Sequence, residues 1–204
     1  MTKQYWDMAR PTNTDERRDQ ILDGLQQVMA ARGFERASVA AIAKAVGLAP
    51  GLVHYHFASK EEVLVALVAR LVERFRRRYA ERLDAARDDW ARLDAFIDAV
   101  AALGPDADPA AAACWAQIGA EAQRLPSVAA PYREALAGAR AELAESVRAV
   151  CATSGRPDHD AELVATGLLA TLEGAFHLSQ AAPGVVPPGE AAGLVRRMAR
   201  GVLA

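Results

Sequence analysis

Cysteine, long apolar runs and β-branched residues are all scarce in this 204-residue chain. Its two cysteines, Cys114 and Cys151, are too few for a disulfide scaffold and are not spaced as metal ligands. No run approaches the ~18 uninterrupted apolar residues that cross a membrane, and the N-terminus has no apolar signal-peptide core. Alanine, with 47 residues, supplies much of the 52% apolar content, whereas Val, Ile and Thr are few. These features predict a soluble, cytoplasmic, all-α protein with no membrane partner.

Acidic residues are missing from one segment, although the net charge of the whole chain is −2. From Arg36 to Lys60 there is no Asp or Glu, where the average composition predicts about three. The same segment keeps Lys44 and two histidines. A surface without carboxylates favours a polyanion as partner, because carboxylates weaken each phosphate contact. Chance exclusion from an alanine-rich stretch is the alternative.

Apolar residues recur at intervals of three and four along most of the chain, which predicts about nine helices and no strand. Residues 1–13 lack this period and are predicted to form a disordered arm. Gly33 and Gly47 are predicted to end the first two helices in the left-handed conformation. The predicted helices cover about residues 15–32, 38–46, 50–57, 59–83, 87–103, 109–124, 128–153, 160–181 and 189–203.

Two short helices joined by a glycine-centred turn form a predicted helix-turn-helix unit over about residues 38–57. Ser38 is placed to cap the first helix, Gly47 stops it, and Pro50 stands at the first position of the second. In such a unit the second helix enters the major groove of DNA.

This unit and its flanks resemble the DNA-binding domain of tetracycline-repressor (TetR) family regulators. The resemblance covers about residues 15–65 and includes more than a dozen spaced positions. The matching runs are Gly33-Phe34, Ser38-Val39-Ala40-Ala41-Ile42-Ala43-Lys44-Ala45-Val46-Gly47-Leu48-Ala49, Gly51, His54-Tyr55-His56-Phe57 and Ser59-Lys60-Glu61-Glu62-Val63-Leu64.

The resemblance implies a homodimer that binds a double-stranded DNA operator until a small-molecule effector releases it. It implies a DNA-binding domain over residues 14–74, and an effector-binding and dimerisation domain over residues 75–204. The stretch from Trp115 to Tyr132 also resembles the choline-responsive branch of the family. A repressor is therefore the predicted function. A transcriptional activator of the same fold and a helical adaptor dimer without DNA binding are the alternatives. No Ser–His–Asp motif, paired metal ligands or glycine-rich phosphate loop favours an enzyme, a cofactor or a metal site.

The predicted DNA contacts combine phosphate binding with base reading. By resemblance, Lys60 holds a phosphate at a helix start, and Ser38 both caps its helix and contacts phosphate. Tyr55 is predicted to contribute to base preference near the end of the recognition helix, while His54 stands where the family commonly has tyrosine. The predicted DNA-binding residues are Ser38, Lys44, Ala49, Pro50, Gly51, His54, Tyr55, His56 and Lys60.

Large apolar residues among many alanines predict an effector cavity in the C-terminal half. A carboxylate beside tryptophan or phenylalanine suits a cation, and a neutral or fatty apolar effector remains the alternative. The predicted effector-binding residues are Phe96, Trp115, Gln117, Ile118, Glu121, Leu169, Glu173 and Phe176. Five arginines between Arg74 and Arg82 are interpreted as a solvated, ion-paired helix face.

Small residues at helical spacing on the penultimate helix predict close approach of another helix across a dimer interface. Packing inside one subunit is the alternative. The predicted interface residues are Gly167, Ala170, Gly174, His177, Leu194 and Met198.

Overall fold

The computed structural model describes residues 13–101, 108–187 and 189–203. Within these ranges the chain forms nine α-helices and no strand, as the apolar period predicts. The predicted disordered arm lies outside the described residues, except that Asn13 begins the first helix. Contacts divide the chain into two compact units, Met1–Leu64 and Val65–Ala204.

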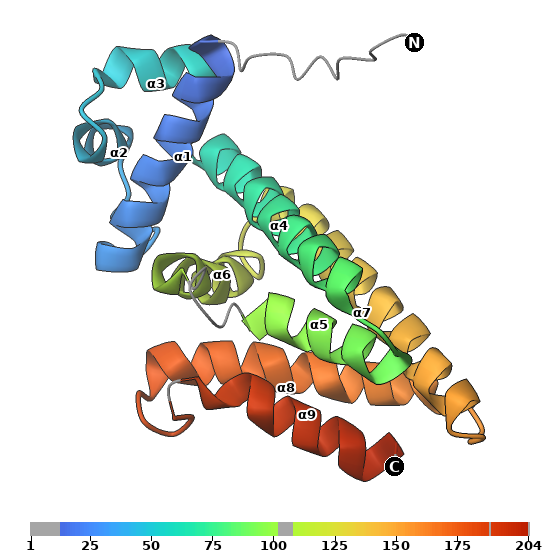
Figure 1. Cartoon of the computed structure of the whole chain (residues 1–204). Helices are drawn as coiled ribbons and strands as arrows, with labels where there is room; N and C mark the ends of the chain where they lie inside the picture. Colours follow the sequence, from blue (N-terminus) through green and yellow to red (C-terminus); the bar gives the residue numbers. More distant parts are fainter. Residues whose placement is uncertain (1–12, 102–107, 188, 204) are drawn as a thin grey trace, which may run out of the picture. The chain divides into compact units, whose positions relative to one another are not determined.

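The first unit contains three helices and the beginning of a fourth (Figure 1). Helix α1 carries the predicted apolar face, and Ile21, Leu25 and Met29 on it are fully buried. Gly24 allows α2 to approach closely, because a Cβ at this position would lie 2.7 Å from the Ile42 carbonyl oxygen. The helices are α1 (Asn13–Arg32), α2 (Val39–Ala45) and α3 (Pro50–His56).

Side-chain caps fix the ends of these short helices. The Ser38 hydroxyl accepts a hydrogen bond from the Ala41 amide at 3.1 Å, which confirms the predicted cap of α2. Gly47 ends that helix with φ of 69°. Ser59 caps α4 (Lys60–Ala85) by accepting from the Glu62 amide, while the Glu62 carboxylate accepts from the Ala58 amide rather than from Ser59. These two bonds form a capping box in which the second donor is shifted by one residue.

The second unit is a bundle built from most of α4 and five further helices. Pairs α7 and α8, α5 and α7, and α8 and α9 pack together, and α8 and α9 lie side by side in Figure 1. Phe96 is fully buried in the core, where each such side chain contributes about 1.5–3 kcal/mol. The further helices are α5 (Asp89–Ala101), α6 (Pro109–Glu121), α7 (Pro126–Thr153), α8 (Ala161–Ala181) and α9 (Glu190–Leu203).

Two of the helix boundaries that differ from the prediction lie on either side of the turn before Pro126. Helix α6 ends at Glu121 instead of residue 124, because the chain turns before Pro126. Helix α7 begins at Pro126 itself, since the fixed φ of proline suits a first helical position. Among the described residues, no helix combines the length and apolarity required to cross a bilayer.

Candidate functional site

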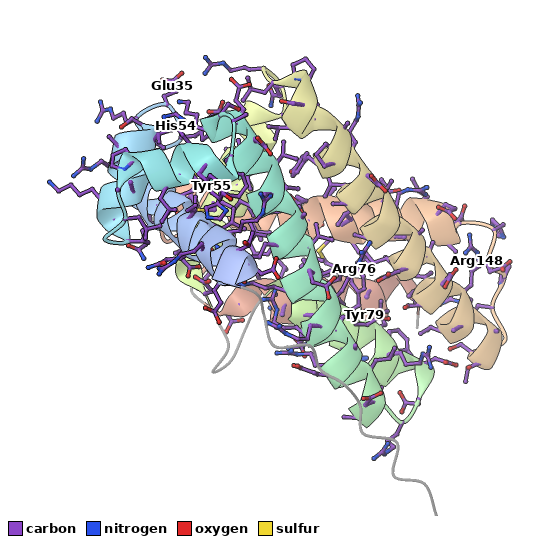
Figure 2. The ribbon with its side chains drawn as sticks, turned by 90° about the horizontal axis from the view of Figure 1, so that it is seen from above. Glu35, His54, Tyr55, Arg76, Tyr79 and Arg148 are labelled. Atoms are coloured by element: carbon purple, nitrogen blue, oxygen red, sulfur yellow. The ribbon has the colours of Figure 1, made fainter. Side chains whose placement is uncertain are left out.

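One face of helix α3 is exposed, and buried apolar side chains on the opposite side pack it against the rest of the unit. Val53 and Phe57 are buried, one turn apart, which turns the opposite side of the helix outward. Tyr55 is 80% exposed and meets the ring of His56 edge-on, with centroids 5.0 Å apart. Figure 2 labels Tyr55 and His54 on this helix. The other exposed residues predicted to bind DNA here are Ala49, Pro50, Gly51 and His54.

Two side chains of α1 hold the C-terminal ends of both short helices. Arg18 donates a hydrogen bond to the His56 carbonyl at 2.8 Å, and its guanidinium lies 4.1 Å from the centroid of the Phe57 ring. Gln20 donates to the Val46 carbonyl at 3.2 Å. These carbonyls have no partner inside their own helices, so the α1 side chains supply one. Neither contact is evident from the sequence, because the partners lie 38 and 26 positions away.

Lys60 ties the start of α4 to the loop that follows α1. Its ammonium donates to the carbonyls of Phe34 at 3.3 Å and Glu35 at 3.4 Å, and lies 4.5 Å from the Phe34 ring centroid. An ammonium has three donors, so these two bonds leave a third for a further acceptor. Lys44, in the last turn of α2, is exposed, as is Ser38.

A cavity of about 120 Å³ lies in the second unit, with roughly ten times the space that one water molecule needs. Most of its wall is apolar, and charged groups are few. The lining residues are Leu71, Val72, Phe75, Arg76, Arg78, Val100, Asp108, Ala111, Ala112, Trp115, Ala135, Leu136, Gly138, Ala139, Glu142, Leu169, Glu173 and Phe176.

One wall of the cavity carries a carboxylate set among aromatic rings. The Trp115 indole N–H donates to both Glu173 oxygens, at 3.0 and 3.1 Å, and the Tyr132 hydroxyl donates to Oε2 at 3.3 Å. The Trp115 and Tyr132 ring centroids are 5.1 Å apart. Burial raises the pKa of Glu173 above its ordinary value, although the hydrogen bonds from Trp115 and Tyr132 lower it. Gly119 makes room for this arrangement, because a Cβ there would lie 2.9 Å from the Tyr132 oxygen.

A second carboxylate, Glu142 of α7, lines the same cavity. Its Oε2 atom is buried and accepts no hydrogen bond. Burial raises the pKa of Glu142, Arg76 lowers it and Glu145 raises it further. Sequence reasoning did not identify Glu142 or Arg76, since charged residues on a long helix usually face solvent.

Four of the eight residues predicted to bind an effector line this cavity: Trp115, Leu169, Glu173 and Phe176. Phe96 and Ile118 do not line it, because both are fully buried among core side chains. Gln117 and Glu121 also lie outside the lining. They are two and six residues after Trp115 on α6, which places them on other faces of the helix.

The arginines of α4 form the predicted solvated, ion-paired face only in part. Arg74 pairs with Asp108 at 3.4 Å, and Arg78 donates to the Ala99 carbonyl at 3.3 Å. Arg76 and Arg78 line the cavity. The interpretation was wrong for Arg78, which is half-buried and bonds a backbone carbonyl, whereas Arg76 lines the cavity and is exposed.

Helices α8 and α9 expose a stripe of small and apolar residues. Gly167, Ala170 and His177 are exposed on α8, Gly174 is half-buried, and a Cβ at either glycine would meet no atom within 4 Å. On α9, Leu194 is 38% and Met198 42% exposed. Leu163, Leu178 and Val202, which were not among the predicted interface residues, are exposed on the same two helices.

Two family descriptions match the chain. "Bacterial regulatory proteins, tetR family" matches residues 21–67, and "BetI-type transcriptional repressor, C-terminal" matches residues 89–204. The first match contains α2 and α3, and the second contains most of the cavity wall.

Known proteins resemble the chain over most of its length. The HTH-type transcriptional regulator BetI of Rhizobium meliloti is 29% identical over 160 residues, which are 78% of this chain and 76% of that protein. A transcriptional regulator from Rhodococcus sp. Rha1 has a TM-score of 0.78 at 26% identity, covering 91% of this chain and 95% of the other. A putative transcriptional regulator from Saccharomonospora viridis, solved in complex with choline, has a TM-score of 0.76 at 24% identity and covers 91% and 94%.

Proposed function

This chain belongs to the tetR family of bacterial regulatory proteins and is a DNA-binding transcriptional regulator, and we propose that a small organic cation in the cavity of its second unit releases it from its operator. In this proposal residues 14–74 bind DNA, and residues 75–204 bind the effector and form the homodimer. Leu71 and Val72 of the first segment also line the cavity.

Operator binding depends on α3 in this proposal. Tyr55 and the exposed opening residues of α3 contact base edges, and Lys60, Ser38 and Lys44 contact phosphates. His54 and His56 contribute ring nitrogens at the end of the helix. A homodimer presents two such helices, which read half-sites about 34 Å apart, one turn of the duplex.

A single observation carries the choice of a cation: the Glu173 carboxylate lies in the cavity wall beside Trp115, Tyr132 and Phe176. A cation placed there gains the carboxylate charge and the negative faces of the rings, worth about 2 kcal/mol for each well-desolvated ring contact. One solved structure supports this choice, the putative transcriptional regulator from Saccharomonospora viridis in complex with choline. We therefore assign the chain to the choline-responsive branch or to a branch with a closely related cationic effector.

Helix α4 links the cavity to the DNA-binding unit. It is one continuous helix from Lys60 to Ala85, and it supplies Leu71, Val72, Phe75, Arg76 and Arg78 to the cavity wall. An effector that binds more tightly to one position of α4 than to another shifts the equilibrium toward that position and lowers DNA affinity. The coupling is reciprocal, so bound DNA lowers effector affinity by the same free energy.

The test measures binding of tetramethylammonium and choline to the full chain, by calorimetry and by release of a selected genomic DNA fragment. We expect Glu173→Gln to weaken cation binding about tenfold, or ~1.4 kcal/mol, because the charge is lost while the shape is kept. Glu134→Gln is the matched control, since Glu134 is an exposed carboxylate of α7. Equal cation affinity in wild type and Glu173→Gln contradicts the proposed site.

Transcription from the selected fragment separates a repressor from an activator. A repressor lowers transcript yield in a purified system, and the cation restores it. A rise in transcript yield on adding the chain identifies an activator of the same fold.

A further inference from the structure

Tyr132 binds the Glu173 carboxylate without lining the cavity. Its hydroxyl donates a hydrogen bond to Glu173 Oε2 at 3.3 Å, yet Tyr132 is not one of the residues in the cavity wall. Trp115, which does line the wall, donates to both carboxylate oxygens from α6. The carboxylate of α8 is therefore held by two other helices, and Tyr132 supplies the bond that comes from α7.

Gly119 lies where a side chain would meet that hydroxyl. It follows Trp115 by about one helical turn, so the two residues share one face of α6. A Cβ at Gly119 would lie 2.9 Å from the Tyr132 oxygen and 3.4 Å from its Cζ. Ordinary van der Waals contacts are about 3.4 Å or longer, so a side chain at Gly119 would displace the hydroxyl from the position in which it binds Glu173.

The space at Gly119 is required by one side chain and not by the approach of two backbones. The three atoms nearest to a Cβ at this position all belong to the Tyr132 side chain. At Gly24, by contrast, the nearest atom is a backbone oxygen of the neighbouring helix. Glycine inside a helix is less favourable than alanine, so the position of the Tyr132 hydroxyl is the feature that glycine preserves here.

We infer that Tyr132 is a positioning residue for the effector-binding carboxylate Glu173, and that Gly119 allows its hydroxyl to reach this carboxylate. The inference rests on the proposed function, because it assumes that Glu173 binds the cation. A donor on Oε2 restricts the directions that the carboxylate can take. It also favours the charged form of the carboxylate, which is the form that attracts a cation.

The experiment measures the affinity of the full chain for tetramethylammonium by calorimetry. Tyr132→Phe removes the hydroxyl and keeps the ring, whereas Gly119→Ala displaces the hydroxyl. We expect each substitution to weaken binding about fivefold, because a hydrogen bond to a charged acceptor is lost. The double variant should bind no more weakly than Tyr132→Phe alone, since both substitutions act on the same bond. Gly201→Ala is the matched control, because a Cβ there meets no atom within 4 Å.

The pH dependence of binding distinguishes an effect on Glu173 from a general loosening of the helices. The hydrogen bond from Tyr132 lowers the pKa of Glu173, so its loss should raise that pKa. As pH is lowered, tetramethylammonium binding should therefore begin to weaken at a higher pH in Tyr132→Phe and in Gly119→Ala than in wild type. Gly201→Ala should keep the wild-type profile.

Thermal unfolding gives a second measurement that needs no ligand. We expect Gly119→Ala to lower the Tm of the wild-type chain, where the new methyl group meets the Tyr132 oxygen. In the Tyr132→Phe background the same substitution should raise the Tm, because the ring carbon that remains nearest is 3.4 Å away and alanine favours the helix.

The outcomes separate this inference from the function on which it rests. Wild-type cation affinity in either single variant overturns the inference and leaves the cation site standing. A double variant that binds more weakly than both single variants overturns it as well, and so does a higher Tm for Gly119→Ala in the wild-type background. Failure of tetramethylammonium to bind the unmodified chain rejects the cation site and, with it, the inference.

Discussion

Glu173 owes its character to its neighbours rather than to its position in the sequence. A carboxylate on a helix is ordinarily solvated, but Glu173 packs against aromatic rings that exclude water. Its hydrogen bonds come from the Trp115 indole N–H and the Tyr132 hydroxyl. Burial outweighs those bonds, so the pKa of Glu173 is raised. Burial therefore disfavours the charged form of Glu173, and a cation bound beside the carboxylate would stabilise that form.

The pH dependence of the stability of the protein without effector should reflect the titration of Glu173. The folded chain binds the Glu173 proton more tightly than the unfolded chain does, so folding loses stability as pH rises from the ordinary value of 4.5 through the raised folded pKa. Glu173→Gln removes that loss. We expect the Tm of the variant to exceed that of wild type by about 2–4 °C at pH 7, the shift that ~1 kcal/mol gives in a chain of this size.

Thermal unfolding followed by circular dichroism at pH 4.5 and pH 7 makes the comparison. The difference in Tm between the two proteins should shrink at the lower pH, because at pH 4.5 half of the unfolded chains already carry the Glu173 proton and the loss on folding is small. A difference that is the same at both pH values contradicts the assignment of the effect to Glu173 titration.

Helix α1 also holds the two short helices in place, a role that its own sequence pattern does not indicate. Its buried face forms the core of the first unit. Its polar side chains Arg18 and Gln20 donate hydrogen bonds to carbonyls at the C-terminal ends of α3 and α2. Because α3 has only seven residues, these bonds and the Phe57 contact fix its direction.

Arg18→Gln should disturb DNA reading without removing a phosphate contact. We expect lower affinity for the operator, a smaller ratio of operator to random-duplex affinity, and an unchanged dependence on salt. Loss of a charged hydrogen bond costs about 1.5–3 kcal/mol of local stability. Arg32→Gln, an exposed arginine of the same helix, is the control. A salt slope lower by about one assigns Arg18 to phosphate binding instead.

Substitutions of Lys60 and Tyr55 should distinguish phosphate binding from base reading. Lys60→Ala should weaken binding to every duplex and lower the salt slope, since a cation that neutralises phosphate is lost. Tyr55→Ala should change base preference, because Tyr55 is 80% exposed on the reading helix. Gel-shift titrations with operator and random duplexes at several salt concentrations measure both. Equal losses on both duplexes for Tyr55→Ala contradict its role in base reading.

The exposed stripe on α8 and α9 concerns how two copies of the whole chain associate. Apolar side chains on it flank glycines that leave open space in the single chain. Small residues let a second pair of helices approach closely, so a four-helix interface between two copies would cover the stripe. A dimer formed in this way supplies the paired reading helices that a two-fold operator needs.

Gly167→Arg should prevent this association and spare the fold. The Cβ of the new side chain meets no atom within 4 Å, and arginine has a higher helix propensity than glycine. We expect a folded monomer by light scattering and circular dichroism, with operator affinity reduced at least tenfold. Ala137→Arg, at an exposed position of α7, is the control and should remain dimeric. A dimeric Gly167→Arg protein places the interface elsewhere.

The sequence by itself determined the helices and the reading unit. Periods of three and four fix which face of a helix is apolar, and Ser38, Gly47 and Pro50 set their helix ends through interactions with near neighbours. Such local interactions need no knowledge of the fold. The same is true of the spaced residues around α2 and α3 that carry the family resemblance.

Only the tertiary structure decided which residues share the cavity. Trp115 and Glu173 were chosen from the sequence for their chemistry, whereas Glu142 and Arg76 entered the wall because α4 and α7 border the same hollow. Phe96 has similar chemistry to Phe176 yet belongs to the core. Periodicity gives the direction of a side chain relative to its own helix, but the neighbour that it meets depends on how five helices pack together.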